Sequence, residues 1–156
     1  MPAPYRSAIA AGSGSTWCWQ ALHNTNARPR GTAERGENPQ ISVVDDDESM
    51  REAMRGLMKS LGYTAQTFVS AEEFLNSCQV ACTSCLIADV QMRGMTGLQL
   101  HRHLVASGKT IPTILITAYP NETVRKRALE DGVVCYLSKP FDENELFACI
   151  RSSLNI

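Results

Sequence analysis

Short apolar runs alternate with amphipathic segments along the chain from residue 41 onward. The apolar runs predict five buried strands, over 41–44, 64–68, 85–88, 112–116 and 133–137. The segments after them predict helices over about 50–61, from Ser70, from Thr96 to about Val105, from Asn121 to near Gly132, and from Asp142. Strands that alternate with helices are typical of a parallel sheet. We therefore expect one α/β domain, a doubly wound (βα)5 fold with a five-stranded parallel sheet.

The helix boundaries carry signals of their own. In the first helix, apolar residues recur at i, i+3, i+4, i+7, i+8 and i+11, which predicts a single buried stripe: Met50, Ala53, Met54, Leu57, Met58 and Leu61. Gly62 then supplies a C-terminal stop. Capping boxes at 70–73 and 142–145 open the second and the last helix. The last helix has an inward stripe at Leu146, Ile150 and Leu154.

The composition is that of an ordinary globular protein, with 44% hydrophobic and 20% charged residues and a formal net charge of −1. A chain of 156 residues is about one domain long. Residues 1–40 carry four Arg and two Glu, whereas the remainder carries eleven Lys and Arg against fourteen Asp and Glu. The expected folded part is therefore mildly acidic, which suits cation binding and gives no reason to expect a nucleic-acid binder.

Residues 1–39 are rich in Gly, Ser, Ala, Asn, Arg and Pro and show no sustained period. We expect a disordered leader there, with a functional tail and a misassigned translation start as the alternatives. No apolar stretch approaches the roughly 18 residues of a membrane span. Gly12 also interrupts the Ala-rich piece at 8–11 too early for a secretory signal. We therefore expect a cytoplasmic protein that does not engage a membrane.

Six cysteines occur, and Cys82 and Cys85 form a CxxC pair. A zinc or redox motif needs a second pair, or a helix that starts directly after the motif. Here Cys85 opens a predicted strand, and no His lies within a few residues. We therefore expect reduced thiols in loop and core.

Polar side chains stand at the carboxyl ends of four of the predicted strands: Asp45 with Asp46, Asp89, Thr117 and Lys139. Ligand sites of open α/β sheets lie at this edge, so these side chains should form one site. Clustered carboxylates resist burial unless a cation neutralises them, and Mg²⁺ does so while also binding phosphate oxygens. The set predicts Mg²⁺ beside a phosphoryl group, with Asp89 as a nucleophile that forms an aspartyl phosphate. Lys139 and Thr117 would contact the phosphoryl oxygens.

Each of these residues alone has an ordinary structural interpretation. Adjacent acids commonly cap a helix, as Asp47 or Glu48 could do here, and a Thr at a strand end is usually structural. Lys139-Pro140 is a common kind of turn, and also a candidate cis peptide that would aim the ammonium into the site. The order of the residues across the strands carries the functional interpretation.

Residues 40–154 resemble the receiver domain of two-component response regulators, the CheY-like family, and are most similar to FixJ-type receivers. The resemblance rests on Val43-Val44-Asp45-Asp46-Asp47, Leu86-Ile87-Ala88-Asp89-Val90-Gln91-Met92, Ile116-Thr117-Ala118, Tyr136-Leu137-Ser138-Lys139-Pro140-Phe141, and Ser-Ala-Glu-Glu-Phe-Leu at 70–75. It implies a receiver domain over 40–156, with a flavodoxin-like three-layer sandwich and strand order 2-1-3-4-5.

The resemblance also implies a role for each acidic residue. Asp89 would be the phosphoacceptor. Asp46, Asp89 and the Gln91 carbonyl would bind Mg²⁺, with Asp45 acting through a water.

Further roles follow from the same resemblance for the other side of the site. Thr117 and Lys139 would hold the phosphoryl group, with the small Ala118 giving it access. Tyr136 would be an aromatic switch that rotates inward when Thr117 moves, with a half-buried packing residue as the alternative. The fourth helix, fifth strand and fifth helix would form the surface that changes.

Two residues depart from the common family pattern. Arg93 stands where Pro is usual, and Pro120 stiffens the start of the fourth helix; both bear on kinetics and switch amplitude rather than on phosphorylation. Arg125-Lys126-Arg127 is expected to be a solvated face. His101 and His103 are expected to be a surface pair.

We expect a single-domain response regulator whose Asp89 accepts a phosphoryl group from a histidine kinase or a phosphotransfer protein. The chain stops directly after the last predicted helix, so we expect no DNA-binding output domain and no direct contact with nucleic acid. Output would go through a downstream protein target or through a homodimer formed on phosphorylation. Apart from self-catalysed phosphotransfer and autodephosphorylation, the protein would not be an enzyme.

Two other classes stay open. In a phosphatase-type hydrolase of similar architecture, Asp45 would be the nucleophile and Asp47 the second acid two residues later. A receiver-like binding module that never turns over is the other alternative, although Asp45, Asp46, Asp89, Thr117 and Lys139 are all intact.

Overall fold

The apolar runs form the five strands of one sheet in the structure, which is a computed structural model and describes residues 38–156. The strands are β1 (Gln40–Val44), β2 (Thr64–Phe68), β3 (Cys85–Asp89), β4 (Thr113–Thr117) and β5 (Cys135–Ser138). All neighbouring strands are parallel, and their order is β2-β1-β3-β4-β5. This arrangement confirms the predicted fold class and strand order. The expected disordered leader lies outside the described residues, apart from Asn38 and Pro39.

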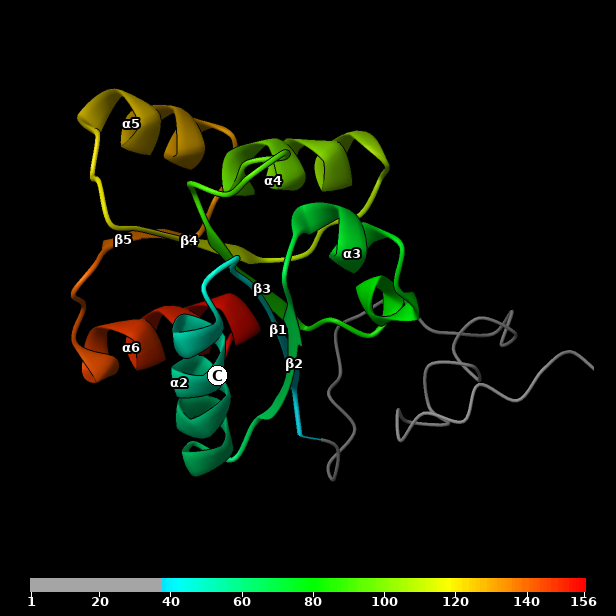
Figure 1. Cartoon of the computed structure of the whole chain (residues 1–156), viewed down its shortest axis with the longest axis vertical. Coiled ribbons are helices and arrows are strands. Elements are labelled where there is room, and N and C mark those ends of the chain that lie inside the picture. The colour runs from blue at the N-terminus through cyan, green and yellow to red at the C-terminus, as the bar shows by residue number, and fades with distance from the viewer. Residues whose placement is uncertain (1–37) are drawn as a thin grey trace, which may run out of the picture.

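Helices cover both faces of the sheet (Figure 1). They are α2 (Glu48–Ser60), α3 (Ala71–Leu75), the 3₁₀ helix η1 (Cys78–Ala81), α4 (Gly97–Ala106), α5 (Glu122–Glu130) and α6 (Glu143–Leu154). Helices α2 and α6 lie on one face, and α3, α4 and α5 lie on the other. None of the helices within 38–156 is long and apolar enough to cross a membrane.

The strands alternate their side chains between two hydrophobic cores, because successive residues of a strand point to opposite faces. In β3, Leu86 and Ala88 pack in the core beneath α3 and α4, whereas Cys85 and Ile87 pack in the core beneath α2 and α6. Strands buried on both faces explain why the sequence shows continuous apolar runs rather than alternation.

Two strands begin later than the sequence predicted. Strand β4 starts at Thr113 and not at residue 112, because Pro112 has no N–H to donate to the sheet. Strand β5 starts at Cys135 and not at 133, because the Val133 N–H donates to the Ala128 carbonyl and belongs to the end of α5. Both strands extend one residue further, and Thr117 pairs with Ser138.

The buried stripe of α2 is largely as predicted. Met54 and Met58 are fully buried, and Met50, Leu57 and Leu61 pack against the core. Ala53 is exposed, so its place in the stripe was wrong.

The helix caps lie at the predicted residues, but the reciprocal hydrogen bonds of the two predicted capping boxes do not form. Ser70 caps α3 by accepting from Glu73 N–H, but the Glu73 carboxylate accepts from Val69 N–H and not from Ser70. Asp142 caps α6 through Asn144 N–H, so the reciprocal box expected at 142–145 does not form.

His101 is a buried residue and not part of a surface pair. It is only 5% exposed, with Nδ1 3.0 Å from Thr113 Oγ1 and Nε2 2.9 Å from the Asp131 carbonyl oxygen. It lies three residues from both Leu98 and Leu104, so it shares their inward face of α4. His103, on the opposite side, is exposed as expected.

The thiols of Cys85 and Cys149 lie in the core. Burial raises the pKa of each to about 12, so both remain protonated at neutral pH. A protonated, buried thiol is unreactive, which agrees with the expectation of reduced core thiols.

Gly97 brings the start of α4 against the end of β3. A Cβ at this position would lie 2.5 Å from the Asp89 carbonyl oxygen and 3.0 Å from Leu115 Cδ2. The Gly97 N–H also donates to the Val90 carbonyl at 3.3 Å. Main-chain atoms cannot give way cheaply, so this close approach requires glycine.

We predict that Gly97→Ala lowers the free energy of unfolding by about 2 kcal/mol, because the added methyl group forces α4 away from β3. Gly56→Ala is the matched control, since a Cβ on this α2 residue would meet no atom within 4 Å. That control should stabilise the fold by about 0.5–1 kcal/mol. Urea unfolding compares the two variants, and equal stabilities would contradict the close approach.

Candidate functional site

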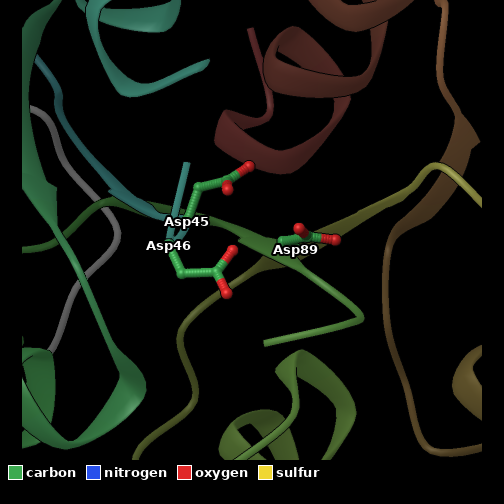
Figure 2. Close-up of side chains that lie close together, drawn as sticks. All are labelled: Asp45, Asp46 and Asp89. Atoms are coloured by element: carbon green, nitrogen blue, oxygen red, sulfur yellow. The ribbon is translucent and has the colours of Figure 1, made fainter. Parts of the chain in front are cut away.

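Three carboxylates meet at the carboxyl edge of the sheet. Asp45 and Asp46 follow β1, and Asp89 ends β3, the strand next to β1 (Figure 2). Each residue offers a carboxylate oxygen, and these oxygens lie within 4.8 Å of one another. The structure therefore brings together the acidic residues that the sequence placed at one site.

Asp45 is almost completely buried, at 3% exposure, and both of its carboxylate oxygens accept hydrogen bonds. Oδ1 accepts from Asp47 N–H at 2.9 Å, and Oδ2 accepts from Lys139 Nζ at 3.2 Å. Asp46, in contrast, is exposed. The two adjacent acids therefore differ, with one fixed by its neighbours and the other open to solvent.

Asp89 is 9% exposed and has two polar neighbours. Gln91 N–H donates to Oδ1 at 3.2 Å, and Lys139 Nζ lies 3.6 Å from Oδ2. Burial raises the pKa of the Asp89 carboxyl above its ordinary value, and the negative charges of Asp45 and Asp46 raise it further. The Gln91 N–H and the Lys139 ammonium offset this only in part.

Lys139 reaches the carboxylates from the turn after β5. Its N–H donates to the Thr117 carbonyl at 2.7 Å, and the Lys139–Pro140 peptide is cis, as the sequence suggested. Only 22% of its side chain is exposed. Its ammonium contacts Asp45 and Asp89 together, which makes it the cation that the site already contains.

Thr117 and Tyr136 both accept hydrogen bonds from the loop before α5. Thr117 is fully buried at the end of β4, and its Oγ1 accepts from Tyr119 N–H at 3.1 Å. Tyr136 is half-buried in β5, and its hydroxyl oxygen accepts from Asn121 N–H at 3.4 Å. Their proposed phosphoryl-holding and switching roles stay predictions.

Asp47 is not part of the cluster. Its carboxylate accepts from Ser49 N–H at 2.9 Å and caps α2, which is the ordinary role considered for it. The contribution of Arg51, by contrast, was missed by the sequence analysis: its Nη1 donates to the Asp45 carbonyl at 2.7 Å. A long side chain one turn inside a helix gives no sequence signal for a bond of this kind.

The donor set fits a hard divalent cation. Among residues 38–156, three carboxylates face the ammonium of Lys139, so the cluster keeps an excess of negative charge. After burial, the charges of Asp45 and Asp46 are a further cause of the raised pKa of Asp89. Carboxylate oxygens are the ligands that Mg²⁺ prefers, usually one or two of them together with waters and phosphate. Asp45, Asp46 and Asp89 are the residues that would hold such an ion.

The domain thus combines a five-stranded parallel sheet with acidic residues at the carboxyl ends of β1 and β3 and a lysine after β5. A family model described as the response regulator receiver domain matches residues 41–151. The chain therefore belongs to the response regulator receiver family, which confirms the resemblance drawn from the sequence.

Particular relatives agree with this family. The response regulator protein TodT of Pseudomonas putida is 37% identical over 116 residues, covering 74% of this chain and 51% of TodT. The transcriptional regulatory protein FixJ of Azorhizobium caulinodans is 32% identical over 118 residues, covering 76% of this chain and 56% of FixJ. The chain thus spans about half the length of the curated relatives it matches.

Two solved structures have the same fold as this chain. A response regulator receiver protein from Burkholderia phymatum superposes with a TM-score of 0.67 at 38% identity, covering 76% of this chain and 97% of that chain. The crystal structure of FixJ-N superposes with a TM-score of 0.69 at 26% identity, covering 76% and 95%.

We predict that Asp89→Asn raises the free energy of unfolding at neutral pH in the presence of a chelator. The folded-state pKa of Asp89 is raised above the unfolded value, so its ionised form destabilises the folded state. As pH falls through the raised pKa, the folded wild type takes up the proton first and regains this stability. The advantage of the variant should therefore shrink toward pH 3.8, the ordinary value for Asp.

Urea unfolding across this pH range measures the effect. Asp142→Asn is the matched control, because Asn caps a helix about as well as Asp and this exposed residue lies outside the cluster. Its stability should stay within about 0.5 kcal/mol of the wild type. An Asp89→Asn variant that is less stable than the wild type at pH 7 would contradict the prediction.

Proposed function

We propose that this protein is a phosphoryl-accepting response regulator that acts in the cytoplasm in a two-component phosphorelay. Asp89 would accept the group from a phosphohistidine of a histidine kinase or a phosphotransfer protein. The observation that carries the proposal is the position of Asp89: it is buried at the end of a central strand, beside two further carboxylates and within 3.6 Å of Lys139. Membership of the receiver family supports the same function.

In the proposed reaction, an Asp89 carboxylate oxygen forms a bond to phosphorus while the bond from phosphorus to the donor nitrogen breaks. The electron pair of that bond leaves with the donor imidazole, and the product is an aspartyl phosphate. Lys139 would turn from the carboxylates to the phosphoryl oxygens. A Mg²⁺ ion bound by Asp45, Asp46, Asp89 and the Gln91 carbonyl would supply charge neutralisation.

The proposed output depends on the loop before α5. Thr117 Oγ1 and the Tyr136 hydroxyl both accept bonds from this loop, through Tyr119 and Asn121. If the Thr117 hydroxyl turns to a phosphoryl oxygen, it gives up the bond to Tyr119, and the loop and the start of α5 can rearrange. The surface of α5, β5 and α6 would then change for a downstream protein or a second copy of this chain.

The capping role of Asp47 supports this function over a phosphatase-type reaction at Asp45. That alternative requires the second acid, Asp47, to face the reacting group, whereas its carboxylate is bonded to the first turn of α2. We propose no enzymatic activity other than self-catalysed phosphotransfer and autodephosphorylation.

We predict one phosphoryl adduct when the protein is incubated with Mg²⁺ and acetyl phosphate, detected by intact-mass spectrometry. The adduct should vanish in Asp89→Asn, because the nucleophilic oxygen is lost. Asp47→Asn is the matched control, since it removes a neighbouring carboxylate, keeps the cap and should still be modified. Lys139→Met should slow the reaction on the order of 100-fold by removing a group that balances charge.

Two results would count against this proposal. An adduct that survives in Asp89→Asn would bring Asp45 forward as the nucleophile. No adduct from acetyl phosphate or from a phosphorylated histidine phosphotransfer protein would instead favour a binding module that never turns over.

A further inference from the structure

Arg51 lies one turn inside α2, and its side chain contacts the loop of residues 45–47, called the acidic loop below. Its Nη1 donates to the main-chain carbonyl of Asp45 at 2.7 Å, and the residue is half-buried. A bond from a charged donor at this distance is among the stronger hydrogen bonds in proteins. It is directed to the main chain that leads into Asp46.

Arg51 closes a ring of hydrogen bonds around this loop. Asp47 N–H donates to Asp45 Oδ1 at 2.9 Å, and Arg51 N–H donates to the Asp47 carbonyl at 3.1 Å. The Arg51 side chain completes the ring at the Asp45 carbonyl. Asp46 lies between Asp45 and Asp47, so both of its chain neighbours are held while its own side chain stays exposed.

Arg51 and Lys139 differ in what they contact. The Lys139 ammonium forms ion pairs with carboxylate oxygens of Asp45 and Asp89, which are the atoms that a metal ion would need. Arg51 bonds to a carbonyl oxygen and leaves those carboxylates available. A bound cation would therefore compete with Lys139 but not with Arg51.

We propose that Arg51 is a positioning residue for the metal site: it fixes the Asp45–Asp47 loop so that Asp46 faces Asp89 before a divalent cation arrives. This inference rests on the proposed function, since it assigns Mg²⁺ to the cluster. A preformed loop lowers the cost of ordering the ligands on binding. Groups that orient metal ligands typically contribute 10–100-fold to affinity.

The sign of the effect separates positioning from simple electrostatics. A positive charge beside a cation site repels the ion, so loss of the Arg51 charge alone would tighten Mg²⁺ binding. Loss of a positioning bond weakens binding instead. We therefore predict that Arg51→Met raises the Kd for Mg²⁺ on the order of 10-fold, measured by isothermal titration calorimetry on the full chain.

Two further variants complete the experiment. Arg55→Met is the matched control, because Arg55 lies one turn further along α2 and bonds to Glu52 and Thr67 rather than to the acidic loop. It removes the same charge from the same helix and should leave the Kd unchanged or slightly lower. Arg51→Lys keeps the charge and part of the reach, so it should give an intermediate Kd and carries the test if Arg51→Met does not fold.

A Kd for Arg51→Met equal to or below that of the wild type would overturn the inference. If the wild type forms the Mg²⁺-dependent phosphoryl adduct while Arg51→Met keeps its Mg²⁺ affinity, only the role of Arg51 fails. If the wild type neither binds Mg²⁺ nor forms an adduct, the proposed function fails, and the inference fails with it.

Discussion

The repulsion among three carboxylates at the ends of β1 and β3 is the constraint on which the rest of the site depends. Asp45 and Asp89 have lost nearly all contact with solvent, and Asp46 adds a third charge within 4.8 Å. Burial raises the pKa of Asp89, and the negative charges of Asp45 and Asp46 raise it further, even though the ammonium of Lys139 lies beside it. Main-chain N–H groups supply further compensation, from Asp47 to Asp45 and from Gln91 to Asp89.

Sheet topology explains how such an unfavourable cluster can be assembled at all. The order β2-β1-β3 places β1 and β3 side by side although β2 lies between them in the chain. The connections after β1 and β3 leave toward opposite faces, α2 on one and α4 on the other, so the edge above the two strands stays open (Figure 1). Hydrophobic cores on both faces fix the strands, and the main-chain contact at Gly97 fixes the segment that follows Asp89.

The strands, the helices and the position of the acidic site could be predicted from the sequence because each depends on a local pattern of residues. Apolar runs mark the strands, and the residue after each run necessarily stands at the carboxyl edge, which brought Asp45, Asp46 and Asp89 together without knowledge of any contact. Features that depend on tertiary structure were not accessible in this way. His101 was misplaced because a polar residue within an inward stripe looks like a surface residue until its buried partners, Thr113 and the Asp131 carbonyl, are known. The bond from Arg51 to the Asp45 carbonyl depends equally on where the helix sits.

The contacts of His101 also belong to a set of hydrogen bonds that differ between the two ends of α5. At its C-terminal end, α5 is held by two consecutive residues of α4, since His101 Nε2 lies 2.9 Å from the Asp131 carbonyl and Arg102 Nε lies 2.6 Å from the Asp131 carboxylate. At its N-terminal end, the cap residue Asn121 has a longer bond, 3.4 Å to the Tyr136 hydroxyl. The cap residue lies four residues after Thr117 along the chain, so the switching role proposed for Thr117 would act on the end of α5 that has the longer bond.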